Sequence, residues 1–253
     1  MTAGALLDKA SRLYVGNFAL MLGISVIVHI PSIALRIIRF SRTAVGTRTG
    51  IQVILPELLW LLIELLIISP WTGGAAAQAV SDVYLGNDVT VTSALREAWR
   101  KYPALLRAHF IPVLSILGGF FLCLIPGVIL LFSYAFITPI VMFESISKSR
   151  DIRRRSMSLV QGYRGKVFVI VVIVFLIDIL AQTGFRLMLR PFIGAAATTR
   201  LTPLLIECVG IVASPMASIS LTLLYYDLRI RKEGFDLELL SSGIGGGEEI
   251  SLS

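Results

Sequence analysis

Long apolar runs alternate with short basic links along this chain, and the pattern predicts a helical protein that crosses a membrane several times. The run from Leu13 to Leu35 contains no Asp, Glu, Lys or Arg, and a membrane helix needs about 20 mostly apolar residues. The run from Ala108 to Phe143 also lacks these charges. As one helix it would be about 54 Å long, which exceeds a hydrocarbon core of ~30 Å. We therefore expect a hairpin there, with its turn at Ile125-Pro126-Gly127.

The complete pattern predicts an all-α membrane helical bundle that forms a single transmembrane domain over residues 1–240, with a flexible tail at 241–253. Its six expected spans are 13–38, 55–80, 108–125, 127–144, 167–187 and 201–226. The links at 92–103 and 151–161 carry apolar residues on one helical face and basic residues elsewhere. We therefore expect them to be interfacial helices that lie on the membrane surface.

A group of residues before the first span recurs further along the chain, which suggests an internal repeat. With an offset of 88 residues, Leu7, Ala10, Arg12 and Tyr14 reappear as Leu95, Ala98, Arg100 and Tyr102. Ile152 and Ser156 form a weaker third copy, with the spacing of Ala94 and Ala98. These copies predict three units, each an interfacial helix followed by two spans. The alternative is chance similarity between amphipathic helices.

Composition and charge place the chain in a bilayer and predict its orientation. Hydrophobic residues make up 56% and charged residues 15%, whereas soluble domains carry about 25% charged residues. The formal net charge of +7 comes from Lys and Arg in short loops, so anionic lipid rather than nucleic acid is the expected partner. Sixteen of these bases fall on the side of both termini and seven on the other side. This bias predicts cytoplasmic termini for a multi-pass protein of the bacterial inner membrane.

Ionisable and polar side chains inside the spans are the candidate functional residues, because such groups are costly in a bilayer and often mark a site. They share one helical face in the first, second and fifth spans and lie beside small residues in the sixth. The set is His29, Arg36, Glu57, Glu64, Asp178, Gln182, Arg186 and Glu207. We expect a shared polar centre in the outer half of the bilayer. It either fixes helix register through ion pairs or binds a polar headgroup or an ion.

The familiar sequence signatures of catalysis and of metal binding are missing. No nucleophile elbow, phosphate loop, H-E-x-x-H or Rossmann glycine pattern occurs. Cys123 and Cys208 stand alone in apolar segments, and a single histidine at the polar centre is weak evidence for a metal. We therefore expect neither an enzyme nor a cofactor.

A polar motif closes the last span and is typical of a chain leaving the membrane. It comprises Tyr225, Tyr226, Asp227, Arg229, Arg231, Lys232, Gly234, Phe235 and Asp236. The tyrosines suit the interface, the bases suit an anionic surface, and the acids can pair with the bases. Gly234 permits a turn, after which Phe235 would dip back into the interface. The alternative is a motif that docks a partner protein.

This motif resembles the end of the bacterial membrane proteins grouped as the glycerophosphoryl diester phosphodiesterase membrane domain. Further segments fit that family between residues 70 and 240: Tyr84-Leu85-Gly86, Ile125-Pro126-Gly127, Phe143-Glu144, Arg155-Ser156 and Gly162. The family name comes from proteins that join such a domain to a separate phosphodiesterase barrel of about 250 residues. The resemblance therefore implies a topology and a membrane location, and no catalytic residue.

Three function classes follow from these patterns. The first is a non-catalytic membrane scaffold or accessory subunit that holds a protein partner or a second copy of the chain. The alternative is a transporter or a protein that binds lipid headgroups at the polar centre. An intramembrane enzyme is the third, and no catalytic motif supports it.

Overall fold

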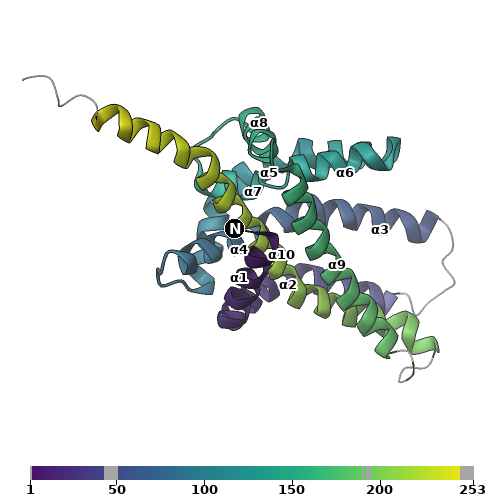
Figure 1. Ribbon diagram of the computed structural model, residues 1–253. Helices are drawn as coiled ribbons and strands as arrows, with labels where there is room; N and C mark the ends of the chain where they lie inside the picture. Colours follow the sequence, from purple (N-terminus) through teal and green to yellow (C-terminus); the bar gives the residue numbers. More distant parts are fainter. Residues whose placement is uncertain (1, 43–50, 190, 192–194, 246–253) are drawn as a thin grey trace, which may run out of the picture.

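Helices form every regular element of the described chain in the computed structural model (Figure 1). The structure describes residues 2–42, 51–189, 191 and 195–245, and it describes their side chains except at 35, 36, 38–42, 51–54, 57, 195–204 and 235–245. Five helices in these ranges are long and apolar enough to cross a membrane, and a sixth crossing results if the two bent N-terminal helices form one span. The chain is a multi-pass helical membrane bundle, which confirms the predicted fold class.

The N-terminal helix bends away from the first span instead of continuing into it. α1 (Ala3–Gly16) ends where the Asn17 side chain donates to the carbonyl of Leu13 at 3.1 Å. α2 (Phe18–Arg42) follows after a bend of 82°. An asparagine side chain competes with helical hydrogen bonds and so favours this break. The predicted span at 13–38 therefore begins too early, because its first residues belong to α1.

The second span is a single rod with an irregular turn near its centre. It consists of α3 (Ile51–Ile63), the π-helix η1 (Glu64–Ile68) and α4 (Ser69–Tyr84), and it contains the predicted span 55–80. Pro70 follows the π turn. Because a proline ring clashes with the carbonyl four residues earlier, the wider turn relieves that clash. π turns are frequent at functional sites, and this one begins at Glu64, a predicted site residue.

A single helix, α5 (Val91–Leu122), replaces the predicted interfacial helix at 92–103 and the predicted span at 108–125. A capping box between Thr90 and Ser93 starts the helix. Pro103 lies inside α5 without ending it, because a helix packed against its neighbours tolerates the loss of one backbone hydrogen bond. The neighbour with the largest contact is α4. The prediction of a separate interfacial helix before this span is therefore wrong.

The hairpin after α5 turns at Cys123, before the predicted turn at Ile125-Pro126-Gly127. Cys123 has an extended backbone between α5 and α6 (Leu124–Ser133). Gly127 lies within α6, where an added Cβ would come 2.6 Å from the Phe120 ring. The missing side chain allows α6 to pack closely on α5. Gly127 therefore serves helix contact rather than the turn.

The fourth span, Leu124–Phe143, contains a turn at residues 134–136, where a side chain from the next helix enters it. α6 and α7 (Ile137–Phe143) together form this span, which matches the predicted span at 127–144. The Ser156 hydroxyl donates to the carbonyl of Ser133 at 2.8 Å and accepts from the backbone N–H of Phe136 at 3.3 Å. Ser156 belongs to α8 (Ser149–Val160), which occupies the predicted interfacial segment at 151–161.

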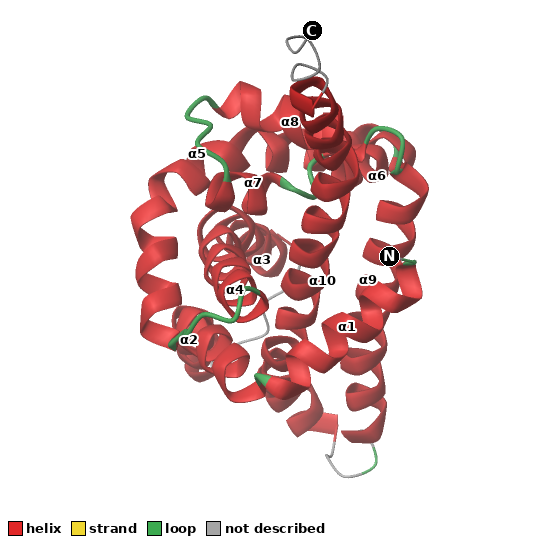
Figure 2. Ribbon diagram, turned by 60° about the vertical axis from the view of Figure 1, so that its left-hand side comes forward, coloured by secondary structure: helices red, strands yellow, loops and turns green. Residues whose placement is uncertain are grey.

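The last two spans are α9 (Arg164–Leu189) and α10 (Ala195–Gly245), which contain the predicted spans 167–187 and 201–226. α10 continues through Gly234, so the predicted turn there is wrong. A single glycine costs a helix only about 1 kcal/mol. The C-terminal part of α10 projects from the bundle in Figures 1 and 2. Helix extends to Gly245, past the predicted start of the tail at 241, and residues 246–253 lie outside the described chain.

Successive connections alternate between the two ends of the bundle (Figure 1). The α4–α5 link, α8 and the C-terminal part of α10 lie toward one end, whereas the α5–α6 turn and the C-terminal end of α9 lie toward the other. This alternation is what the order of the predicted spans requires.

The segments that suggest an internal repeat occupy equivalent buried positions. Each uses two residues that lie four apart on one helical face. Leu6 and Ala10 in α1, Ala94 and Ala98 in α5, and Ile152 and Ser156 in α8 are all at most 2% exposed. The three helices therefore pack into the bundle through the same two positions.

A side-chain hydroxyl from each of these helices also reaches a backbone carbonyl of a distant span. Tyr14 donates to Val212 in α10 at 2.6 Å, and Tyr102 donates to Ile67 in η1 at 2.9 Å. Ser156 donates in the same way to a carbonyl of α6. The first unit thus packs on the second span of the third unit, the second on that of the first, and the third on that of the second. These three contacts connect the predicted units in a ring.

Candidate functional site

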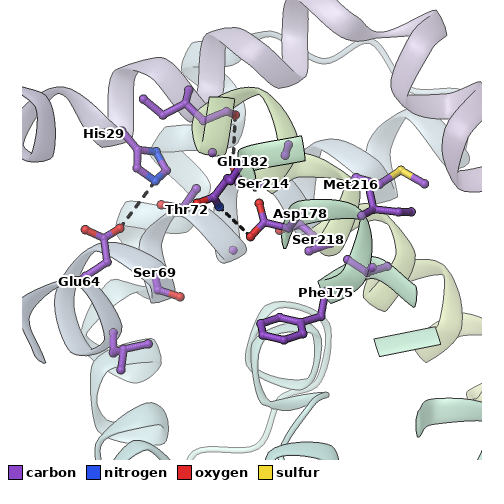
Figure 3. A pocket seen from close by; sticks show the side chains of 18 of the residues that line it. His29, Glu64, Ser69, Thr72, Phe175, Asp178, Gln182, Ser214, Met216 and Ser218 are labelled. Carbon is purple, nitrogen blue, oxygen red and sulfur yellow. Dashed lines mark hydrogen bonds and ion pairs between the residues drawn. The ribbon is translucent and has the colours of Figure 1, made fainter. Parts of the chain in front are cut away.

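An open cavity of about 1750 Å³ lies among the spans and reaches the predicted polar residues (Figure 3). Its walls come from α2, the second span, α6, α7, α9 and α10. Among the described elements, α3 packs substantially only on η1, while α9 packs on α10, α1 and α6. Within the described residues, α3 and α9 do not pack on each other, and the cavity occupies the space between them. The predicted site residues on the cavity walls are His29, Glu64, Asp178, Gln182, Arg186 and Glu207.

One side of the cavity is a polar contact between α2 and η1. The carbonyl of Ser25 lies 2.7 Å from His29 Nδ1, and since a carbonyl only accepts, Nδ1 carries the hydrogen. His29 Nε2 therefore faces Glu64, whose Oε1 is 3.7 Å away (Figure 3). Ser32 donates to the other oxygen of Glu64 at 3.3 Å. Glu64 is thus held at the first residue of the π turn.

The opposite side carries a second carboxylate in a different environment. Asp178 accepts a hydrogen bond from Gln182, one turn further along α9, with Nε2 to Oδ2 at 2.9 Å. Both side chains point into the cavity in Figure 3. Arg186 continues the same face of α9. Among the described residues, neither Asp178 nor Arg186 forms an ion pair.

α10 contributes Glu207 and a row of small residues to the cavity wall. Gly210, Ser214 and Ser218 line it beside Glu207. The Ser214 hydroxyl lies 3.4 Å from that of Ser25 in α2, which joins the two helices. A Cβ added to Gly210 would meet only the Gln182 amide, at 3.8 Å. α10 therefore leaves room in front of the polar groups of α9.

Two predicted members of the polar centre cannot be placed in the cavity. Arg36 belongs to α2 and Glu57 to α3, but their side chains lie outside the described residues. The structure therefore brings together the six predicted residues whose side chains it describes.

A polar pair that the sequence analysis overlooked borders the same cavity. Thr138, on the cavity wall, lies 3.1 Å from Nε2 of His109 in α5, and His109 Nδ1 lies 2.9 Å from the carbonyl of Leu105. Nδ1 therefore carries the hydrogen and Nε2 accepts from the Thr138 hydroxyl. The available signal was a histidine within the long uncharged run. Trp60 and Phe175 on the walls carried no signal beyond their apolar character.

The cavity wall combines polar groups with apolar surface, which suits the binding of a small molecule. In the described part of the chain, no group of three or more His, Cys, Asp or Glu is placed to hold a metal ion. The described polar groups on the walls are carboxylates, hydroxyls, an amide, an imidazole and a guanidinium. The larger part of the wall is apolar, as in binding sites for small molecules.

The motif at the end of the last span forms a separate cluster, which we call the clasp. Its members are Glu144, Arg155, Lys166, Tyr225, Asp227, Arg229, Arg231, Lys232 and Glu233. Glu144 accepts from Arg155 Nε at 3.0 Å and from the Tyr225 hydroxyl at 2.8 Å. Arg229 donates to Glu233 at 2.7 Å, and Arg155 also pairs with Glu233. These contacts join α10 to α8 and to the end of α7.

The remaining clasp contacts join α10 to α9 and to the end of α8. The carboxylate of Asp227, which is 7% exposed, pairs with Lys166 and with Arg231, the latter at 3.1 Å. Lys232 donates to the carbonyls of Ser158 and Gln161, where a cation suits the C-terminal end of a helix. The predicted pairing of the motif's acids with its bases therefore occurs.

Three further members of the motif lie outside the clasp. The Tyr226 hydroxyl lies 2.7 Å from that of Ser81 in α4. Gly234 is an ordinary helical residue of α10. The side chains of Phe235 and Asp236 lie outside the described residues, so the predicted return of Phe235 to the interface is not placed.

Comparison of the chain with protein-family models, with curated proteins and with solved structures finds no match in any of the three. The family resemblance therefore stays a prediction. The cavity and the clasp are the two features from which a function follows.

Proposed function

We propose that this protein binds an amphiphile, a molecule with an apolar body and a polar end, within the bilayer and takes part in lipid handling or transport. The observation that carries this function is the open cavity of about 1750 Å³ with ionisable groups on its wall. Pockets for small molecules are about 300–1,000 Å³. The larger space and its position among membrane spans suit a lipid-sized ligand.

The face of α9 that lines the cavity changes character along its length. Ile170, Val174, Asp178, Gln182 and Arg186 recur every fourth residue, and all of them lie on the cavity wall. At 1.5 Å per residue this stripe is about 24 Å long. Its first part is apolar and its second part is polar. A ligand that lies along α9 therefore needs an apolar part and a polar part in the same order.

Ionisable groups inside a bilayer cost free energy unless they pair with another group or bind a ligand. A charged side chain at the bilayer centre costs about 2.5–3.5 kcal/mol on insertion scales. Glu64 is held by His29 and Ser32, which fits the interpretation that some of these groups fix helix register. Asp178 and Arg186 form no ion pair among the described residues, and they favour binding over register.

The proposed function includes a membrane and an orientation for the protein. Exposed Arg150 and Arg154 on α8 suit an anionic leaflet, and the bias of Lys and Arg favours cytoplasmic termini in a bacterial inner membrane. The cavity's polar end would then face the outer leaflet.

In a variant with Cys123 and Cys208 replaced by Ala, a cysteine introduced at Ser158 should resist a membrane-impermeant thiol reagent in intact cells. Labelling of that cysteine would overturn the orientation.

A scaffold or accessory role is the second function, and α10 supports it. This helix continues to Gly245, and the clasp orients its C-terminal part beside α8. The resemblance to the phosphodiesterase membrane domain family favours the same role, because such a domain accompanies a separate catalytic unit. A partner protein or a second copy of the chain would use this extension.

Lipid retention tests amphiphile binding directly. The chain is purified in mild detergent, and native mass spectrometry counts the lipids that remain bound. Gly210→Phe places a ring in the cavity, because a Cβ there meets only Gln182. Gly184→Phe is the matched control: Gly184 lies on α9 away from the cavity wall, and its added Cβ meets nothing within 4 Å.

We expect lipid bound to the unaltered protein and to Gly184→Phe, and at least about fivefold less on Gly210→Phe, a loss of roughly 1 kcal/mol in affinity. Equal retention by both variants, or no retained lipid in the unaltered protein, would remove the support for this function.

A further inference from the structure

We infer, on the basis of the proposed amphiphile binding, that the ligand's polar end is a cation and that Asp178 binds it. The ligand class is a hydrophobic cation: an aliphatic or aromatic body that carries an ammonium or a similar positive group. The inference names the chemistry of the ligand at the cavity, beyond its being an amphiphile.

Asp178 has less charge compensation from the described residues than Glu64 on the same cavity wall. It lies well inside α9, and the one hydrogen-bond donor that the described residues offer it, the Gln182 amide, is neutral. A carboxylate accepts several hydrogen bonds, so acceptor capacity remains after the Gln182 contact. A charge within a membrane span is unfavourable when no opposite charge compensates it. A cationic ligand supplies the missing opposite charge.

Glu64 provides the contrast within the same cavity. Its carboxylate lies 3.7 Å from Nε2 of His29 and accepts a hydrogen bond from Ser32. Side chains of the protein therefore supply partners for Glu64. Arg186 does not pair with Asp178, because eight residues of helix separate them by about 12 Å along the axis. Glu64 and Asp178 thus differ in whether a described residue supplies an ionisable partner.

The apolar wall next to Asp178 suits the body of such a ligand. Phe175 lies on the preceding turn of α9, lines the cavity and is 61% exposed, and Figure 3 shows it on the same helix as Asp178. Trp60 contributes a second aromatic ring from α3. Cations bind aromatic faces within about 6 Å, more strongly where water is excluded. Aromatic rings and a carboxylate together select for a hydrophobic cation over an anion of equal size.

Two ions of matched shape and opposite charge test this selectivity. Tetraphenylphosphonium and tetraphenylborate are offered to the full-length protein in neutral detergent, and equilibrium dialysis measures binding relative to protein-free micelles. The variants are Asp178→Asn, which removes the charge, and Asp178→Glu, which keeps it. Asp88→Asn, at an exposed residue of the α4–α5 link, is the control.

We expect the phosphonium to bind more tightly than the borate, and its affinity to fall at least about tenfold in Asp178→Asn. Asp178→Glu and Asp88→Asn should retain the preference. If Asp178→Asn does not fold, the preference of the unaltered protein and of Asp178→Glu still decides the matter.

Equal binding of both ions, or phosphonium binding that Asp178→Asn leaves unchanged, would overturn the cation inference while amphiphile binding stands. If neither ion binds and no lipid is retained, the proposed function itself fails. The two failures are therefore distinguishable.

Discussion

The cavity and the clasp use the same kinds of side chain for opposite purposes. In the clasp, every acid meets a base: Asp227 pairs with Lys166 and Arg231, and Glu144 pairs with Arg155. In the cavity, Asp178 contacts the Gln182 amide and no base among the residues that the structure describes. A dense ion-pair network holds helices together, whereas an incompletely compensated carboxylate beside open space remains available to a ligand. Under the proposed function, the clasp stabilises one end of the bundle and the cavity among the spans binds the ligand.

The largest effect is expected from breaking the clasp at Asp227. The change Asp227→Asn leaves Lys166 beside a neutral amide, and removal of one partner of a buried ion pair costs about 3–5 kcal/mol. Thermal unfolding in detergent should show a fall in stability of about 3 kcal/mol. Asp151→Asn, at an exposed acid of α8, is the control and should change little. An equally mild effect of both changes would mean that the clasp does not hold the bundle.

A smaller and conditional effect is expected in the cavity. The double change of Glu64→Gln and Asp178→Asn keeps side-chain volume and most hydrogen bonds, so stability without ligand should change by less than about 1 kcal/mol. A ligand at 100 times its Kd stabilises a protein by about 2.7 kcal/mol. Thermal unfolding with and without tetraphenylphosphonium should therefore show stabilisation of the unaltered protein and little of the variant. Loss of stability without ligand would instead assign these acids to helix register.

The contrast between the two regions also shows what could be predicted from sequence. The polar stripe from Asp178 to Arg186 was visible because helical spacing places those residues on one face. The pairing of Asp227 with Arg231 follows from the same spacing. Both depend on local periodicity, which tertiary packing did not change.

The features that were not predicted depend on contacts between distant segments. Gly127 resembles a turn residue in sequence, and its role is the close contact of α6 with α5. Pro103 and Gly234 are usual breakers of helices, yet both lie inside one. The turn within the fourth span depends on Ser156, more than 20 residues beyond Ser133. The open space beside Asp178 results from the separation of α3 and α9, which no local pattern encodes.

The smallest effect is expected at the solvent-facing part of the clasp. It would show how the stability that the clasp contributes divides between its exposed and buried contacts. Arg229 donates to Glu233 and to the Tyr225 hydroxyl, and its side chain is 38% exposed. Arg229→Lys keeps the charge but loses the planar fork that reaches both partners. Because solvent screens exposed ion pairs, the loss should be about 0.5 kcal/mol and should shrink at high salt. Thermal unfolding at low and high ionic strength measures both quantities. A loss as large as that of Asp227→Asn would show that the exposed and buried parts of the clasp act as one cooperative unit. A small loss that is sensitive to salt would place the stabilising contribution at the buried pair of Asp227 and Lys166.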